Sequence, residues 1–168
     1  ELNVKSPVLD ISLFKTNKLF AFANLAALIN YATTFAVTFV LSLYLQYIKG
    51  LTPREAGMIL VTQPIVMAVM ATWAGKLSDK TDPRILASLG MGISAVGLLM
   101  LVPLNASTST LYLIVTLVVL GLGFGLFSSP NTNSIMGSVD RRFLGLASGT
   151  VDTMRLTGQM LSMGIAAL

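Results

Sequence analysis

Cysteine and histidine are both absent from the 168 residues of this chain. Their absence excludes disulfide bridges and the metal sites that thiolates and imidazoles build in proteins. Hydrolytic catalysis generally uses histidine, cysteine or clustered carboxylates, and none of these is present here. We therefore expect no enzyme, no metal site and no bound cofactor.

Charged residues are also scarce. They make up 11% of the chain, whereas hydrophobic residues make up 54% and the mean hydropathy is +0.80. A soluble domain of this length could not bury so much apolar surface, because small domains leave a large share of their area exposed. The net charge of +4 comes from basic residues between long apolar runs. This pattern favours a protein embedded in a lipid bilayer and gives no reason to expect a nucleic-acid partner.

The charged residues bracket stretches that are long enough to cross a membrane. Thirty uncharged residues separate Lys18 from Lys49, and twenty separate Glu55 from Lys76. The 55 uncharged residues before Asp140 suffice for two crossings of about 20 residues each. A turn rich in proline, asparagine and serine at 103–110 divides them. The expected spans are 19–47, 55–75, 83–102, 111–135 and 145–168.

Three of these spans begin with a recognisable helix start. The stretch 52–55 (Thr-Pro-Arg-Glu) has a capping threonine, proline at the first helical position and a carboxylate three residues after the cap. This is the pattern of a capping box. The pair 82–83 (Asp-Pro) repeats the cap and the proline, and the pair 16–17 (Thr-Asn) can cap the first span.

The distribution of basic residues predicts an orientation. Nine of them fall on one side if the spans alternate, and only Lys49 and Arg54 fall on the other. The nine are Lys5, Lys15, Lys18, Lys76, Lys80, Arg84, Arg141, Arg142 and Arg155. Because basic loops stay in the cytoplasm, we expect a multi-pass protein of the cell membrane with these loops inside. Residues 1–18 are expected to form a cytoplasmic amphipathic linker, or alternatively a tether to another domain.

The first span carries a stripe of polar side chains. At about 100° per residue the stripe occupies about 80° of arc, and apolar side chains cover the opposite face. Its members are Asn24, Tyr31, Thr34, Thr38 and Ser42. Polar groups inside a membrane are costly and usually face protein or water. The stripe therefore predicts the wall of a hydrated cavity, although hydrogen bonds between helices would produce the same pattern.

Polar groups on the second and fourth spans extend this hypothesis. Gln63 shares a face with methionines, which suits either an adaptable apolar pocket or ordinary packing, and Pro64 should bend that helix. Gly121 and Gly125 share a face that leads to Asn131, which indicates either a bending gate or close packing. The candidate substrate path consists of Asn24, Tyr31, Thr34, Thr38, Gln63 and Asn131.

Carboxylates are absent from the apolar parts of the first four spans. Proton coupling usually requires an intramembrane acid that changes charge, and Asp152 in the fifth span is the one candidate. Arg155 follows three residues later, on the same face of a helix. Such a pairing favours the charged form of Asp152. We therefore expect a structural ion pair there rather than a proton site.

The loop at 75–84 resembles the signature between two consecutive helices of the major facilitator superfamily, roughly Gly-x-Leu-Ala/Ser-Asp-Arg/Lys-x-Gly-x-Arg/Lys. The matching residues are Gly75, Leu77, Ser78, Asp79, Lys80 and Arg84. Asp82 departs from the signature, since glycine is usual at that position. The stretches 7–14, 24–26, 43–46, 128–133, 147–149 and 153–155 resemble the fourteen-helix drug:proton antiporter branch, so the resemblance covers nearly the whole chain.

The resemblance implies an all-α membrane protein with about five helices from the C-terminal six-helix bundle of a major facilitator transporter. Residues 19–168 would form that partial bundle, and its N-terminal half would be missing. Such transporters rock two bundles about a central site. Gly75, Asp79, Lys80 and Arg84 would form a gating loop on the cytoplasmic side, with Asp79 near a helix N-terminus of the missing half. A solvated loop that only sets orientation is the alternative.

These expectations point to a proton-driven efflux transporter for amphipathic or drug-like small molecules. The proton is the expected coupling ion, and its carboxylate should lie in the missing half. A transporter of a specific metabolite is the first alternative. A membrane scaffold or receptor that transports nothing is the second, and it would need no hydrated cavity.

Overall fold

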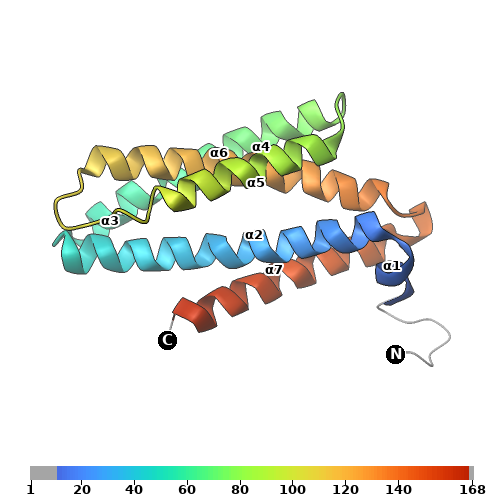
Figure 1. Cartoon of the computed structure of the whole chain (residues 1–168), viewed down its shortest axis with the longest axis horizontal. Coiled ribbons are helices and arrows are strands. Elements are labelled where there is room, and N and C mark those ends of the chain that lie inside the picture. The colour runs from blue at the N-terminus through green and yellow to red at the C-terminus, as the bar shows by residue number, and fades with distance from the viewer. Residues whose placement is uncertain (1–10, 167–168) are drawn as a thin grey trace.

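The computed structural model describes residues 11–166, and every regular element within them is a helix (Figure 1). In chain order the elements are α1 (Ile11–Thr16), α2 (Lys18–Leu43), the π-helical turn η1 (Tyr44–Ile48), α3 (Pro53–Leu60), α4 (Thr62–Ser78), α5 (Pro83–Leu99), α6 (Thr110–Gly137), the 3₁₀ turn η2 (Arg141–Phe143) and α7 (Leu144–Ala166). The long helices run along one common direction. The predicted all-α fold class is confirmed, and most of the predicted linker at 1–18 lies outside the described residues.

The helix starts follow the local chemistry of the sequence. The Thr52 side chain accepts a hydrogen bond from the Glu55 amide, and the Glu55 carboxylate accepts one from the Thr52 amide, which completes the capping box. Asp82 accepts from the Arg84 amide at the start of α5. Asn17 accepts from the Phe20 amide at the start of α2. The predicted helix starts are confirmed. They could be predicted because a helix cap depends only on residues close to it in the chain.

Three helical segments of the described chain are long and apolar enough to cross a membrane. They are Lys18–Ile48, Pro53–Ser78 and Thr110–Gly137. Helix α5 is apolar but has only 17 residues, so its crossing and that of α7 stay predictions. Large apolar side chains such as Phe22, Val69 and Leu99 are more than two-thirds exposed, as expected where lipid is the solvent.

Helix α6 lies at the centre of one group of helices. It packs along its length against α4 and α5, whereas α2 packs mainly against α7 (Figure 1). The contact between α2 and α6 is much less extensive. The chain therefore divides into an α4–α6–α5 group and an α2–α7 pair, which meet along a narrow seam.

Glycines bring the helices of the first group into backbone contact. A Cβ at Gly123 would lie 2.5 Å from the Ser94 amide nitrogen, and one at Gly90 would lie 2.5 Å from the Phe127 amide nitrogen. On the other side of α6, a Cβ at Gly125 would lie 2.7 Å from the Met67 carbonyl oxygen. Side chains cannot fit at these distances. Close packing therefore accounts for Gly123 and Gly125 of α6.

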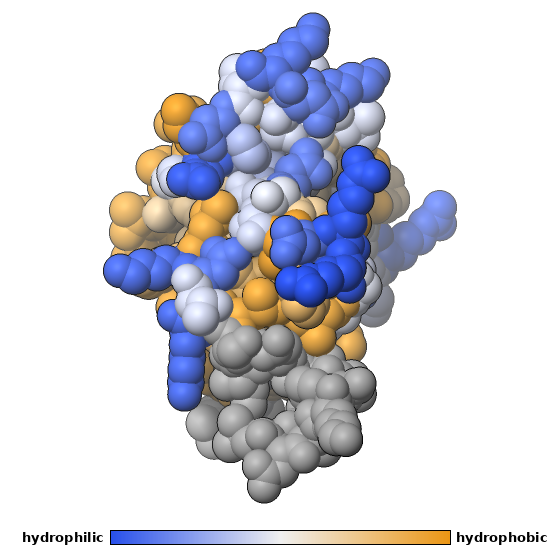
Figure 2. Space-filling view, turned by 90° about the vertical axis from the view of Figure 1, so that its right-hand side faces the viewer, coloured by the Kyte–Doolittle hydropathy of each residue, from blue (hydrophilic) through white to orange (hydrophobic). Residues whose placement is uncertain are grey.

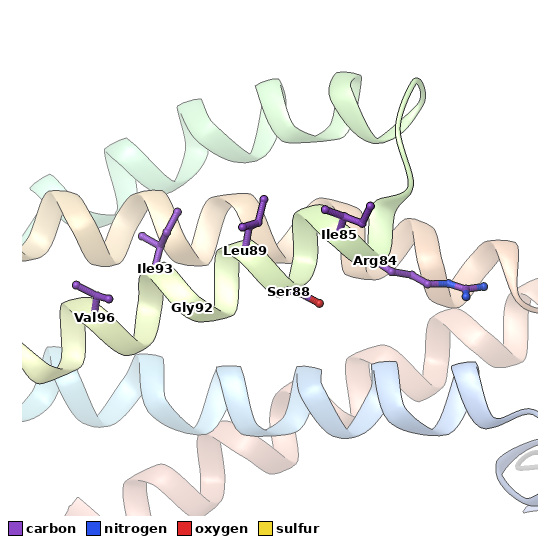
Figure 3. A pocket seen from close by; sticks show the side chains of 7 residues that line it. All are labelled: Arg84, Ile85, Ser88, Leu89, Gly92, Ile93 and Val96. Carbon is purple, nitrogen blue, oxygen red and sulfur yellow. The ribbon is translucent and has the colours of Figure 1, made fainter.

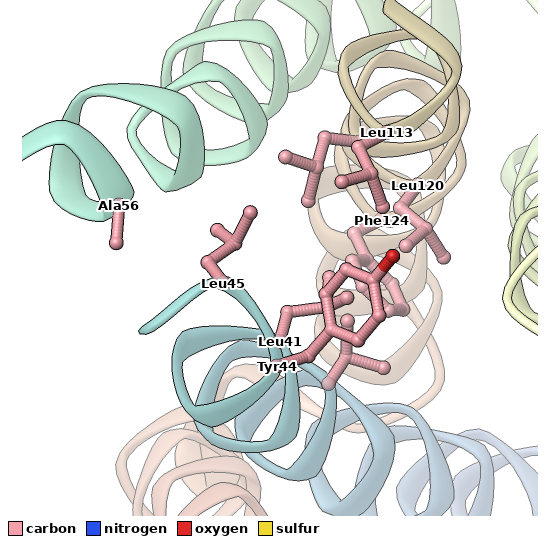
Figure 4. Packing of buried hydrophobic residues seen from close by; sticks show 9 residues of the cluster. Leu41, Tyr44, Leu45, Ala56, Leu113, Leu120 and Phe124 are labelled. Carbon is pink, nitrogen blue, oxygen red and sulfur yellow. The ribbon is translucent and has the colours of Figure 1, made fainter. Parts of the chain in front are cut away.

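A hydrophobic cluster joins the two groups near one end of the bundle. Leu41 and Tyr44 of the first span pack there with Leu120 and Phe124 of α6 (Figure 4). The Tyr44 hydroxyl also donates to the Asn105 carbonyl oxygen at 2.6 Å. This end is thus held by apolar burial and by a hydrogen bond to the loop before α6.

Basic side chains gather at the other end of the bundle. Figure 2 views the molecule from the end at the right of Figure 1, and hydrophilic side chains project from it. The exposed basic residues of α1, of the start of α2 and of the α4–α5 and α6–α7 connections are Lys15, Lys18, Lys76, Lys80, Arg84, Arg141 and Arg142. The predicted segregation is therefore confirmed for these seven residues, whereas Lys5 lies outside the described residues and Arg155 lies against the ring of Tyr31 within the bundle.

Candidate functional site

A groove of about 350 Å³ lies between α2 and the α3–α4 segment. It brings together Thr34, Thr38 and Gln63, three residues of the predicted substrate path. The other lining residues are Gly57, Leu60, Val61, Pro64 and Met67. A mostly apolar wall with a few polar groups is typical of small-molecule sites.

The groove lies beside the junction of α3 and α4. Helices α3 and α4 join at Val61, three residues before Pro64, and the Val61 amide still donates to the Gly57 carbonyl oxygen at 3.0 Å. Proline has no N–H, so the carbonyl of Leu60 loses its usual helical donor. The bend at Pro64 stays a prediction, and both Leu60 and Pro64 line the groove.

The polar groups of the groove are neutral and differ in which hydrogen bonds they can still form. The Thr34 hydroxyl donates to the Asn30 carbonyl oxygen at 2.9 Å, and the Thr38 hydroxyl donates to the Thr34 carbonyl oxygen at 3.2 Å. Gln63 is only 4% exposed and makes no side-chain hydrogen bond to any other described residue. Both hydroxyls therefore face the groove as acceptors, and Gln63 brings a free amide.

Asn24 and Tyr31, two further residues of the predicted substrate path, do not line this groove. Asn24 is fully buried, its amide nitrogen donates to the Phe20 carbonyl oxygen at 2.9 Å, and its Oδ1 has no partner among the described residues. The Tyr31 hydroxyl lies 3.4 Å from the Ser128 hydroxyl of α6. Of these two members of the predicted path, Asn24 thus bonds within its own helix, whereas Tyr31 contacts α6.

Asn131 lines a second, smaller groove. This groove of about 210 Å³ lies between α2, α5 and α6, and Arg84 also lines it. Asn131 is 5% exposed, and its amide nitrogen donates to the Ala23 carbonyl oxygen at 3.1 Å. The structure therefore brings Asn131 close to one residue of the predicted gating loop, but not to the larger groove.

The predicted gating loop is anchored to α6. The Asn133 amide nitrogen donates to the Ser78 hydroxyl at 2.6 Å, and the Ser78 hydroxyl donates to the Gly75 carbonyl oxygen at 2.8 Å. A Cβ at Gly75 would lie 2.8 Å from the Ser129 hydroxyl oxygen. The role of Asn133 could not be predicted from the sequence, because its partner lies 55 residues away. Ser78 and Gly75 thus position the loop that follows.

The charged residues of this loop are exposed. Asp79, Lys80 and Arg84 all lie on the surface. Within residues 11–166 the one ion pair shorter than 4.0 Å joins Arg142 to Asp140 at 3.6 Å. Asp79 is therefore available for a partner outside the described part of the chain.

The ion pair expected between Asp152 and Arg155 does not form in the structure. The guanidinium carbon of Arg155 instead lies 5.8 Å from the centre of the Tyr31 ring. Sharing a helix face allows a pairing but does not require it, and here the arginine extends across the α2–α7 contact. This expectation is corrected: Arg155 has an aromatic neighbour, and both charged residues are exposed.

The outer face of α5 forms a further depression of about 630 Å³ (Figure 3). It is lined by Arg84, Ile85, Ser88, Leu89, Gly92, Ile93 and Val96, all from this one helix. Apart from Arg84 and Ser88 at one end, the side chains are apolar. The depression is therefore an apolar helix face rather than a chemical site.

Comparison with known proteins agrees with this architecture. Residues 23–168 match the family model of the Major Facilitator Superfamily. The riboflavin transporter RibZ of Clostridioides difficile is 34% identical over 155 residues, which cover 92% of this chain and 34% of that protein. The uncharacterized transporter YebQ of Escherichia coli is 34% identical over 168 residues, which cover all of this chain and 36% of that protein.

A multidrug transporter is also similar. The multidrug efflux pump LfrA of Mycolicibacterium smegmatis is 29% identical over 148 residues, which cover 88% of this chain and 29% of that pump. The chain thus spans about a third of the length of the curated relatives it matches. Because the family model matches most of its residues, the chain belongs to the major facilitator superfamily.

Proposed function

We propose that this chain forms part of the C-terminal bundle of a secondary active transporter that works by alternating access. The observation that carries the proposal is the neutral, partly polar groove between α2 and the α3–α4 segment. Alternating access moves two bundles relative to each other around such a site. An N-terminal half of the same protein would supply the other wall.

We propose that the substrates are amphipathic small molecules that are exported. The groove offers apolar contacts from Leu60, Val61 and Met67 beside a few hydrogen-bonding groups. Methionine adapts its shape to different ligands, which suits a broad substrate range. The name of the relative LfrA, a multidrug efflux pump, supports the same class.

We propose the proton as the coupling ion and expect no cofactor. No carboxylate lines the groove among the described residues. A proton site needs a group that changes charge during the cycle, so the coupling acid would lie in the N-terminal half. The basic end of the bundle would face the cytoplasm of a cell-membrane protein, because basic loops are retained there.

We also propose that the loop with Gly75, Asp79, Lys80 and Arg84 controls closure on the cytoplasmic side. Asp79 is exposed and ends α4, while Ser78 beside it is fixed to α6 by Asn133. A fixed carboxylate can bind the N-terminus of a helix in the other bundle, where the helix dipole favours negative charge. Its partner would then change between the open and closed states.

A second candidate is the transport of one specific metabolite. The observation that favours it is the similarity to a protein named as a riboflavin transporter. A single dedicated substrate would need a more exact arrangement of polar groups than a broad drug pump needs.

Transport by everted membrane vesicles that contain the full-length protein tests the proposal. We expect proton-gradient-dependent movement of the neutral dye Nile red or the cationic dye ethidium, and a protonophore should abolish it. Movement of riboflavin alone supports the second candidate. Absence of gradient-dependent movement of all three probes overturns the proposal and leaves the scaffold or receptor hypothesis.

A further inference from the structure

Gln63 is the unsatisfied polar group of the larger groove. Its residue is 4% exposed, and its amide makes no hydrogen bond to any described residue. The Oδ1 atom of Asn24 is both unpaired and enclosed, whereas Gln63 lines the groove and its amide atoms keep access to it. Its hydrogen-bonding capacity is therefore directed at whatever enters.

The backbone of Gln63 is held firmly in place. A Cβ at Gly121 would lie 2.7 Å from the Gln63 carbonyl oxygen and 2.9 Å from Cβ of Val66. Because Gly121 has no side chain, α4 can rest directly on α6 at this point. The amide is thus presented from a fixed backbone, which is the condition for a selective contact.

The rest of the groove supplies acceptors. The hydroxyl protons of Thr34 and Thr38 are already donated to backbone carbonyls, so only their lone pairs remain free. Proline at 64 deprives the Leu60 carbonyl of its helical donor. Among the side chains that line the groove, only Gln63 has free N–H donors, and none is charged.

We propose that Gln63 binds the amide or imide edge of an uncharged ligand through a pair of hydrogen bonds. A neighbouring N–H and C=O on a planar ring are complementary to the C=O and N–H of the glutamine side chain. Further donors on the ligand would meet the acceptors of Thr34 and Thr38. The volume of about 350 Å³ accepts a small heterocycle. This inference rests on the proposed function and names the ligand class of its groove.

Two flavins provide matched probes for this subsite. Riboflavin carries an imide N–H between two carbonyls, and 3-methylriboflavin has a methyl group in place of that hydrogen. Binding of each to the purified full-length transporter is measured by equilibrium dialysis. We expect wild type to bind riboflavin at least about tenfold more tightly, because a site that pairs with an N–H rejects the analogue that lacks it.

Variants test whether Gln63 causes this discrimination between the two flavins. Gln63→Leu should bring the two affinities to within about twofold of each other, whereas Gln159→Leu on α7, a half-buried glutamine outside the groove, should keep the tenfold ratio. If Gln63→Leu does not reach the membrane, Gln63→Asn replaces it, since its shorter amide is withdrawn from the groove and the ratio should again fall.

Three outcomes overturn the assignment. They are wild-type protein that binds both flavins equally, wild-type protein that binds neither, and a Gln63 variant that keeps the full ratio. A protein that moves dyes with the proton gradient but fails this test loses the Gln63 subsite and keeps the proposed function. A protein that moves no probe loses the proposed function itself.

Discussion

The side-chain amide of Asn133 donates a hydrogen bond to the hydroxyl of Ser78 over 2.6 Å. This contact joins the last part of α6 to the last residue of α4. Asp79 follows Ser78 directly, so the position of its carboxylate depends on a helix more than fifty residues away. The contact thereby fixes the point at which the exposed loop between α4 and α5 begins.

Replacing Asp79 with asparagine in the full-length transporter should lower transport about tenfold, as a coupling free energy of about 1.4 kcal/mol would do. The charge is lost while the shape is kept, so membrane insertion should stay normal. Vesicle transport and the amount of protein in the membrane measure the two effects. Asp140→Asn, another exposed acid at the same end, is the control, and unchanged transport by Asp79→Asn would remove the gating proposal.

The contact between Asn133 and Ser78 should contribute about 1 kcal/mol to stability, as a typical hydrogen bond does. A double-mutant cycle with Ser78→Ala and Asn133→Ala measures this term from the melting behaviour of the purified full-length protein. Thr153→Val, which removes a hydroxyl that bonds only within its own helix, serves as the control. A coupling energy near zero would show that the two residues act independently.

Gly90→Ala should destabilise the protein by about 1–3 kcal/mol, because the new methyl group would overlap backbone atoms of α6. Gly92→Ala is the matched control on the same helix, since nothing lies within 4 Å of a Cβ there. This control should be neutral or slightly stabilising, because alanine favours the helix. Melting temperatures in detergent compare the two, and equal values would contradict the close contact between α5 and α6.

Cysteine substitutions should distinguish the groove from the packed interior. In a full-length protein without other cysteines, Thr34→Cys and Gln63→Cys should react with a small maleimide much faster than Asn24→Cys, because Asn24 is fully enclosed. Labelling rates in membranes measure this order. Protection at all three positions from both sides of the membrane would count against transport.

The features that depend on neighbouring residues could be predicted from the sequence. The caps at Asn17, Thr52 and Asp82 follow from the residues around each helix start. The polar stripe of the first span also placed Thr34 and Thr38 correctly on a common surface. Hydrophobicity and capping chemistry are local, so a single chain is enough to read them.

Contacts between distant helices could not be predicted in this way. The polar stripe alone does not show that Asn24 is buried between helices whereas Thr34 lines a groove. The surroundings of each residue depend on which helix packs against that part of the stripe. The same holds for Arg155, which lies over the ring of Tyr31 instead of pairing with Asp152 on its own helix. Choices among competing partners are settled by tertiary structure.

The direct contact of α6 with α4 and α5 restricts how the bundle can deform. Where two backbones touch with no side chain between them, no change of rotamer can absorb a displacement. The three helices must then move as one rigid body. The interface that can deform is the one with α2, near the hydroxyl groups of Tyr31 and Ser128. A change in the width of the groove would therefore come from sliding at that interface rather than from bending of a glycine-rich helix.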